Sequence, residues 1–303
     1  MKCVKQLLKS SPLAALEARI LLAYALNWPR TALITRANDF LPNFLVDRFL
    51  ELQAQRVIGK PIAQLVGSRE FFGLDFNVTP HVLIPRPETE LLVECALAAV
   101  HKIRFPRILD LGTGSGAIAI AIAHARPDAR IIATDYCTYA LDVARQNARR
   151  LLGDAALMQP LPTLVPNHNS SSDGLTHPHF ILRHGDWFNA LDKAYQAVPA
   201  QFDVIVSNPP YIRVSDPHLC EGDLRFEPLY ALTDYANGLS AIHTIISGSV
   251  IWLSPGGKIW IEHGHNQAKT VRSMFYTYGL DSIRSIRDLA GIERVTGGAV
   301  RKS

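Results

Sequence analysis

Residues 202–212 read Phe202-Asp203-Val204-Ile205-Val206-Ser207-Asn208-Pro209-Pro210-Tyr211-Ile212, an apolar run that stops at an Asn followed by two prolines. A short β-branched run of this kind predicts a buried parallel strand. Ligands of open α/β sheets bind at the carboxyl ends of such strands, so polar chemistry is expected where this one ends.

The turn after this strand is rich in hydrogen-bond acceptors. Each proline lacks an N–H and favours an extended residue before it, so the turn offers carbonyl oxygens and few donors. We expect the side-chain oxygen of Asn208 and a carbonyl of Pro209 or Pro210 to hold a planar –NH2 group, with Tyr211 packed against its plane. That group is a carboxamide or the exocyclic amine of a base. A proline-rich turn that only caps the strand is the alternative.

Strands and helices alternate from Arg107 onward, a pattern typical of a parallel sheet. Seven such strands predict one α/β domain with a doubly wound, mostly parallel sheet. The predicted strands cover residues 107–111, 130–135, 180–184, 202–207, 258–262, 282–288 and 294–299. The predicted helices of this part cover residues 116–124, 138–152, 237–253 and 266–278.

The chain before this domain has a helical pattern. One amphipathic helix is predicted to begin with Ser11 as N-cap and Pro12 at its first position and to end near Trp28. A second runs from about Pro42 to Gly59. These helices predict a small N-terminal domain over residues 1–65, either a stabilising cap or a docking surface for a macromolecular substrate.

Two further segments complete the predicted domain organisation. Residues 66–86 contain short aromatic pieces around Gly73 and predict a β-hairpin linker. The α/β domain then covers residues 87–303. Within it, residues 153–178 are rich in Pro, Asn, Ser and His without a period, which predicts a long, mobile surface-loop insertion.

Composition restricts the class of protein. A chain of 303 residues with 48% hydrophobic residues is ordinary for a globular protein of two domains. No run approaches the roughly 18 apolar residues of a membrane span, and the first residues lack the apolar core of a secretion signal. The four cysteines are scattered without C-x-x-C spacing, so we expect no metal site, no disulfide framework and a cytoplasmic location. The net charge of +4 is too mild to identify a nucleic-acid binder by itself, and no basic target-recognition domain is evident, so we expect no stable nucleic-acid binding.

The end of the first strand of the sheet carries the glycine loop Asp110-Leu111-Gly112-Thr113-Gly114-Ser115-Gly116. Glycines let a backbone turn sharply and approach a ligand closely. A dinucleotide fold would use G-x-G-x-x-G, whereas this loop reads G-x-G-x-G after a carboxylate that would repel a pyrophosphate. Asp110 suits the amino group of a cofactor such as S-adenosylmethionine, and the loop N–H groups suit its carboxylate or ribose end.

Two other strand ends extend this nucleoside site. Asp135 ends the second strand about twenty residues on, where an acidic side chain binds ribose hydroxyls. The third strand is followed by Asp186 and Trp187, which we expect to accept from an adenine amine and to stack on its ring. A core indole is the alternative for Trp187.

With these motifs in place, the chain resembles a class I S-adenosylmethionine-dependent methyltransferase. More narrowly, it resembles the HemK/PrmC family of glutamine methyltransferases that modify peptide chain release factors. The resemblance covers nearly the whole chain. It rests on Arg69-Glu70-Phe71, Leu83-Ile84-Pro85-Arg86-Pro87-Glu88-Thr89-Glu90, Asp110 to Gly116, Asn208 to Tyr211, Asp216-Pro217-His218-Leu219, Arg225-Phe226-Glu227-Pro228, Glu262-His263-Gly264 and Glu293-Arg294-Val295-Thr296.

The resemblance implies a Rossmann-like fold and methylation of the glutamine nitrogen in the Gly-Gly-Gln motif of class I release factors, with S-adenosylhomocysteine as product. Carried over by motif, Gly112 to Gly116, Asp135 and Trp187 resemble cofactor-binding positions. Asn208 to Tyr211 resemble the glutamine site, where Asn208, Pro209 and Tyr211 are the expected catalytic residues. Residues 153–178 depart from the family pattern, which usually has a short connection there.

Three alternatives stay open at this point. A sister group methylates glutamine in a ribosomal protein, and the Pro85 to Glu90 form of the loop favours the release-factor branch. The exocyclic amine of adenine presents the same planar –NH2 group, so an N6-adenine DNA or RNA methyltransferase is a second alternative. The third is a nucleotide-binding interaction module in translation without enzymatic activity.

Overall fold

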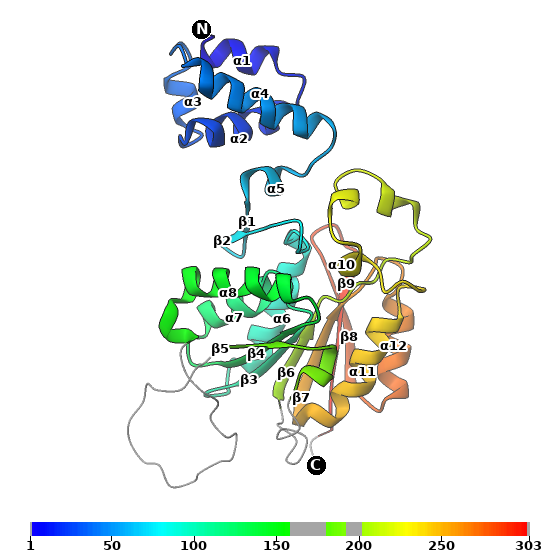
Figure 1. Cartoon of the computed structure of the whole chain (residues 1–303). Helices are drawn as coiled ribbons and strands as arrows, with labels where there is room; N and C mark the ends of the chain where they lie inside the picture. Colours follow the sequence, from blue (N-terminus) through cyan, green and yellow to red (C-terminus); the bar gives the residue numbers. More distant parts are fainter. Residues whose placement is uncertain (1, 158–179, 192–201, 302–303) are drawn as a thin grey trace.

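The computed structural model describes residues 2–157, 180–191 and 202–301 (Figure 1). The predicted loop insertion at 153–178 therefore lies almost entirely outside the described residues. None of the described helices is both long and apolar enough to cross a bilayer.

The α/β domain is built on the predicted seven-stranded sheet, which confirms the expected fold. The strand order is β5-β4-β3-β6-β7-β9-β8, and only β9 is antiparallel to its neighbours β7 and β8. The order reverses between β3 and β6, which places a switch point beside the strand quoted above. The bounds are β3 Arg107–Leu111, β4 Arg130–Asp135, β5 Phe180–His184, β6 Phe202–Ser207, β7 Leu253–Glu262, β8 Asp281–Arg287 and β9 Glu293–Ala299.

Helices cover both faces of this sheet (Figure 1). Strand β6 shows why its residues must be apolar throughout: Val204 and Val206 pack in the core beneath α6 and α7, whereas Ile205 packs in the core beneath α11. Because alternate side chains of a strand point to opposite faces, a strand buried on both faces has a continuous apolar run. The helix bounds are α6 Glu90–Val100, α7 Ala117–Ala125, α8 Thr138–Leu152, α10 Leu229–Leu232, α11 Ser240–Trp252 and α12 Ala268–Thr277.

The N-terminal part is helical, but its first helix was not predicted. Helix α2 begins at Ala15 without a side-chain cap, so the predicted N-cap at Ser11 is wrong. The Ser11 hydroxyl instead accepts from the N–H of Leu13 in the turn between α1 and α2. The bounds are α1 Val4–Ser10, α2 Ala15–Leu26, α3 Ala32–Thr35, α4 Asn43–Val57 and α5 Ile62–Val66.

The predicted hairpin follows these helices and is confirmed as the antiparallel pair β1 Ser68–Phe71 and β2 Leu74–Asn77. Its turn is tied to the sheet domain, because the carboxylate of Glu90, at the start of α6, accepts from the N–H of Phe72 at 2.9 Å. Glu90 thus positions the hairpin as well as complementing the helix dipole.

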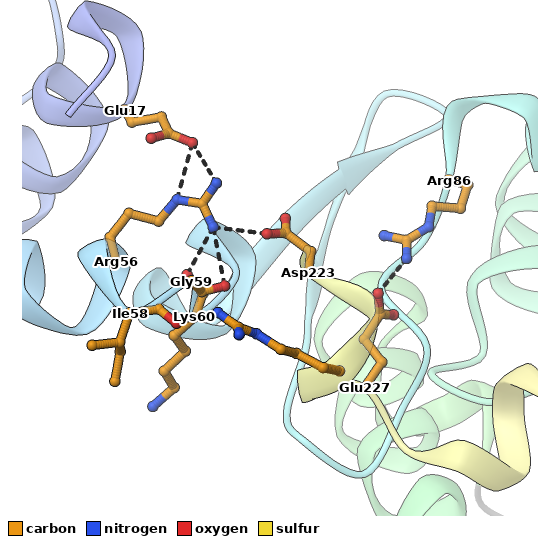
Figure 2. Close-up of polar contacts among 9 residues, drawn as sticks. Glu17, Arg56, Ile58, Gly59, Lys60, Arg86, Asp223 and Glu227 are labelled. Atoms are coloured by element: carbon orange, nitrogen blue, oxygen red, sulfur yellow. Dashed lines mark hydrogen bonds and ion pairs between the residues drawn. The ribbon is translucent and has the colours of Figure 1, made fainter. Parts of the chain in front are cut away.

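Arg56, in α4, links the N-terminal helices to the sheet domain (Figure 2). Its guanidinium donates to Glu17 at 2.7 and 3.0 Å, to Asp223 at 2.7 Å and to the carbonyls of Gly59 and Lys60 at 3.2 Å. Because Asp223 lies 167 residues further along the chain, this one side chain holds two parts of the fold together.

We expect Arg56→Met, which keeps an apolar stem, to lower the free energy of unfolding by about 2 kcal/mol in urea denaturation. The Arg56 side chain is 18% exposed, whereas that of Asp223 is 47% exposed. The matched control Asp223→Asn should therefore cost under about 1 kcal/mol, as exposed ion pairs do. Equal losses in the two variants would contradict the role of Arg56 as the central donor.

Candidate active site

The carboxyl ends of β3, β4, β5 and β6 surround one cavity. It holds about 970 Å³ of empty space, counting the open solvent at its mouth. Most of the predicted site residues line it, namely Gly112, Thr113, Gly114, Ser115, Asp135, Asp186, Trp187, Asn208 and Pro210. Asp110 and Gly116 are not among its lining residues, and neither are Pro209 and Tyr211.

The glycine loop is held in place by hydrogen bonds from its backbone N–H groups to the end of β4. The N–H groups of Gly112 and Thr113 donate to the carbonyl of Thr134 at 2.9 and 2.8 Å, and that of Gly114 donates to Asp135 at 2.8 Å. These three donors are already satisfied, so the expectation that they hold a ligand carboxylate is not supported. The loop instead places small residues against the cavity.

Gly112 and Gly116 have different roles in this loop. A Cβ on Gly112, at φ +73°, would lie 3.3 Å from the ring of Trp187, so a side chain there would crowd the cavity wall. A Cβ on Gly116, at φ +83°, would lie 2.7 Å from the Ile120 side chain and 3.3 Å from that of Ala144. Gly116 therefore permits the packing of α7 on α8 and lies behind the site.

Asp110 lies beneath the loop and is completely buried. One carboxylate oxygen accepts from the Thr113 hydroxyl at 2.6 Å. No described residue meets the distance and angle of a hydrogen bond to the other oxygen, although the backbone of Ala119 lowers the pKa of the group. Burial, opposed in part by this hydrogen bond, raises the pKa of Asp110 to about 7. Asp110 thus orders Thr113, one of the residues that line the cavity.

The raised pKa predicts how Asp110→Asn changes stability. The folded state holds the Asp110 proton at pH values where the unfolded chain has lost it, so stability falls as the pH rises from about 4 to about 7. Asp110→Asn removes this loss. We expect the ligand-free variant to be more stable than wild type at pH 8 by on the order of 1–3 kcal/mol, and similarly stable at pH 4, as measured by urea denaturation. A variant less stable at pH 8 would contradict this.

Asp135 joins the glycine loop to helix α8. Its two oxygens accept from the N–H groups of Gly114 and Cys137, each at 2.8 Å. Burial is the largest influence and raises the Asp135 pKa, while these backbone donors lower it. Each carboxylate oxygen has a second lone pair, so Asp135 can still accept from ribose hydroxyls in the cavity.

Asp186 and Trp187 follow β5 and line the same cavity. Trp187 has the left-handed φ of 46° and is partly buried against the core beneath α11, with its ring over Gly112. The indole therefore packs against the core and also lines the cavity, while its stacking on an adenine ring stays a prediction.

The structure fixes the orientation of Asn208. Its Nδ2 donates to the Thr89 hydroxyl at 3.1 Å. This bond leaves the Asn208 side-chain oxygen as the acceptor for a ligand, as the sequence predicts. Thr89 itself is buried and lines the cavity, a role that sequence reasoning missed.

A smaller second cavity is also lined by Asn208 and holds about 370 Å³, again including open solvent. Pro209, Tyr211 and Glu262 line it, and Asn208 lines both cavities. The Tyr211 hydroxyl donates to Glu262 at 3.1 Å. The Asn-Pro-Pro-Tyr turn thus contributes lining residues to both cavities.

Two comparisons with known proteins agree with this geometry. Residues 1–67 match the family model "PrmC N-terminal domain", and residues 87–159 match "Methyltransferase small domain". The chain is 53% identical over 293 residues to a release factor glutamine methyltransferase of Burkholderia pseudomallei, covering 97% of this chain and 94% of that protein. This chain belongs to the release factor glutamine methyltransferase family.

Solved structures similar to this family member are also methyltransferases. One is the release factor-specific protein-(glutamine-N5) methyltransferase of Alicyclobacillus acidocaldarius, at 25% identity and a TM-score of 0.41, covering 75% of this chain and 99% of that one. Another is a 16S rRNA methyltransferase of Thermus thermophilus in complex with AdoMet and guanosine. It has 17% identity and a TM-score of 0.50, covering 77% of this chain and 50% of that one, and shows the fold.

Sequence reasoning also missed an ion pair that shapes both cavities of this family member. Arg86, which lines both, pairs with the fully buried side chain of Glu227 (Figure 2). Glu227 also accepts from the N–H of Ile84 at 2.8 Å. The only signal for this pair was that both residues lie in motifs that carry the family resemblance.

Proposed function

We propose that the chain transfers a methyl group from S-adenosylmethionine to the side-chain nitrogen of the glutamine in the Gly-Gly-Gln motif of class I peptide chain release factors. The observation that carries this proposal is the position of Asn208, which lines both cavities and whose side-chain oxygen is left free by Thr89. The names and identity of the relatives support the substrate.

The larger cavity fits S-adenosylmethionine. Asp135 can accept from the ribose hydroxyls and Asp186 from the adenine amine, while the ring of Trp187 gives the base a flat surface. Arg86 is the one Lys or Arg among the described lining residues, and it suits a carboxylate. When bound, the cofactor supplies a methyl group activated by a positively charged sulfur.

The smaller cavity suits the glutamine side chain. An amide nitrogen is a weak nucleophile because its lone pair is delocalised into the carbonyl. Asn208 and the carbonyl of Pro209 can accept from the two N–H bonds, so they orient the nitrogen and stabilise positive charge that develops on it. Tyr211, held by Glu262, can pack against the amide plane.

A labelling experiment tests this function. The protein is incubated with radiolabelled S-adenosylmethionine and purified release factor, alongside a release factor whose Gly-Gly-Gln glutamine is replaced. Label on the wild-type factor alone is expected. Undiminished label on the altered factor would overturn the proposed site of methylation.

We further propose that the protein works in the cytoplasm, with residues 1–65, 66–86 and 87–303 as helical domain, hairpin linker and methyltransferase domain. Scattered cysteines support the location, and the mild net charge of +4 supports action without stable nucleic-acid binding.

A further inference from the structure

Glu262 is a buried carboxyl group next to the Asn-Pro-Pro-Tyr turn. It ends β7, which pairs with β6 in parallel, and the last paired residues are Ser207 and Ile261. Glu262, the last residue of β7, and Asn208, the residue after β6, each follow this last pair and therefore lie at the same end of two adjacent strands. Glu262 is only 2% exposed, yet it lines the smaller cavity.

One oxygen of this carboxyl group accepts from the Tyr211 hydroxyl at 3.1 Å. The Thr89 hydroxyl also lies near enough to lower the pKa of the group. The other carboxylate oxygen is buried, and no described residue meets the distance and angle of a hydrogen bond to it. Glu262 also forms no ion pair with any of the described residues. Buried polar atoms in native proteins are nearly always paired, so this oxygen is available for a group that the substrate brings.

The other groups of this cavity cannot take a proton from the substrate. Its described lining contains three titratable side chains, those of Arg86, Tyr211 and Glu262. Arg86 is paired with Glu227 and stays charged. Burial and the neighbouring Glu262 raise the Tyr211 pKa, so its hydroxyl remains a donor.

His263, the next residue along the chain, is not placed to act here. It is buried with its ring nitrogens at the Thr296 hydroxyl and the Gly264 carbonyl, and it lines neither cavity. Glu262 is therefore the described group best placed to receive a proton beside Asn208.

A group that takes up a proton favours methyl transfer to an amide. The nitrogen forms a bond to the methyl carbon as the carbon–sulfur bond breaks with its electron pair on sulfur. The nitrogen then carries a positive charge and must lose one proton. The oxygens of Asn208 and Pro209 can accept hydrogen bonds from it, but amide oxygens are far too weakly basic to keep that proton.

We propose that Glu262 is a further catalytic residue, whose free carboxylate oxygen stabilises the charge building on the substrate amide nitrogen and then accepts its proton. The inference rests on the proposed function. The proton leaves Glu262 for solvent before the next turnover, so the step balances without another reactant.

The surroundings of Glu262 bring its pKa close to neutral pH. Burial raises the Glu262 pKa to about 7, and Glu88 from the loop before α6 raises it as well. The hydroxyls of Thr89 and Tyr211 and the charge of Arg294 on β9 lower it. Because the deprotonated form is the active one, the rate of methyl transfer should rise with pH through this value.

The test is the single-turnover rate of methyl transfer to purified release factor between pH 6 and 9, for wild type and Glu262→Gln. The wild-type rate should rise with pH and level off above about pH 8. Glu262→Gln is isosteric and can still accept from Tyr211. Its single-turnover rate should be about 10²–10³-fold lower than that of wild type at pH 8 and should no longer increase with pH, as expected for removal of a general base.

Two further variants separate catalysis from structure. Glu262→Asp keeps a carboxyl group and should be at least about tenfold faster than Glu262→Gln. Tyr211→Phe removes a hydrogen bond that lowers the Glu262 pKa, so the rise should shift to higher pH whatever the plateau rate. Calorimetry with S-adenosylmethionine should give wild-type affinity for Glu262→Gln, which shows that this variant is folded.

Each result has a defined meaning. A wild-type rate that does not change between pH 6 and 9, or a Glu262→Gln variant with wild-type rate, would overturn the role of Glu262. No methylation of the release factor by the wild-type enzyme would instead overturn the proposed function.

Discussion

Asn208→Ala should lower the single-turnover rate of methyl transfer by about 10²–10³-fold, the loss seen when one preorganised polar group is removed from a developing charge. Asn208 supplies an acceptor whose direction is fixed by its bond to Thr89. Without it, one N–H of the substrate amide has no partner and the nitrogen is no longer aimed at the methyl group. Rapid-quench measurement with labelled cofactor checks the rate.

Cofactor affinity separates this effect from a loss of binding. Asn208 is one of many lining residues of the larger cavity, so the Kd for S-adenosylmethionine should change less than about threefold. Thr89→Val is the matched control, because it keeps the acceptor and removes the group that orients it. Its rate is compared at pH 9, because the Thr89 hydroxyl also lowers the Glu262 pKa. Its rate should lie between those of wild type and Asn208→Ala. Full activity in Asn208→Ala would remove Asn208 from the mechanism.

The centre of the sheet was predictable because β3, β4 and β6 are buried along most of their length. Residues 107–111, 130–135, 180–184 and 202–207 are apolar runs bounded by turn residues, and the structure has strands with these bounds. Strand β7 begins at Leu253, five residues before its predicted start at 258. The prediction missed this first part because Pro255 and the two glycines after it are typical of a turn.

The candidate site was predictable only in part, because its hydrogen bonds join distant residues. Asn208 and Thr89 are 119 positions apart, and Glu227 and Ile84 are 143 apart. Local pattern gives the strand end at which a side chain lies, but not the partner that another strand or loop brings to it. Thr89, Glu227 and Glu262 therefore lay within motifs that we quoted without a role.

Side-chain direction was the second limit. Asp110 and Gly116 belong to the glycine loop motif, which predicts contact with the cofactor. In the structure, Asp110 points beneath the loop to Thr113, and Gly116 faces α8. A loop with alternating glycines turns its residues to both sides, so motif membership alone does not decide which ones line the cavity.

Asp135→Ala should weaken S-adenosylmethionine binding by at least about 100-fold, or about 2.7 kcal/mol. The variant loses the acceptor for the ribose hydroxyls. It also leaves the N–H groups of Gly114 and Cys137 without their carboxylate, so the glycine loop keeps its two hydrogen bonds to Thr134 but loses the one that fixes Gly114. The cost therefore combines a ligand contact with the preorganisation of the loop.

Asp135→Asn divides these two contributions. Its side-chain oxygen can accept from one of the two N–H groups, while its NH2 group faces the other donor and costs binding by repulsion. Calorimetry should place its affinity between those of wild type and Asp135→Ala. Thermal unfolding of the ligand-free proteins should show the loop contribution alone, because no ribose is present. Wild-type affinity in Asp135→Ala would show that neither the ribose contact nor the loop anchor depends on this carboxylate.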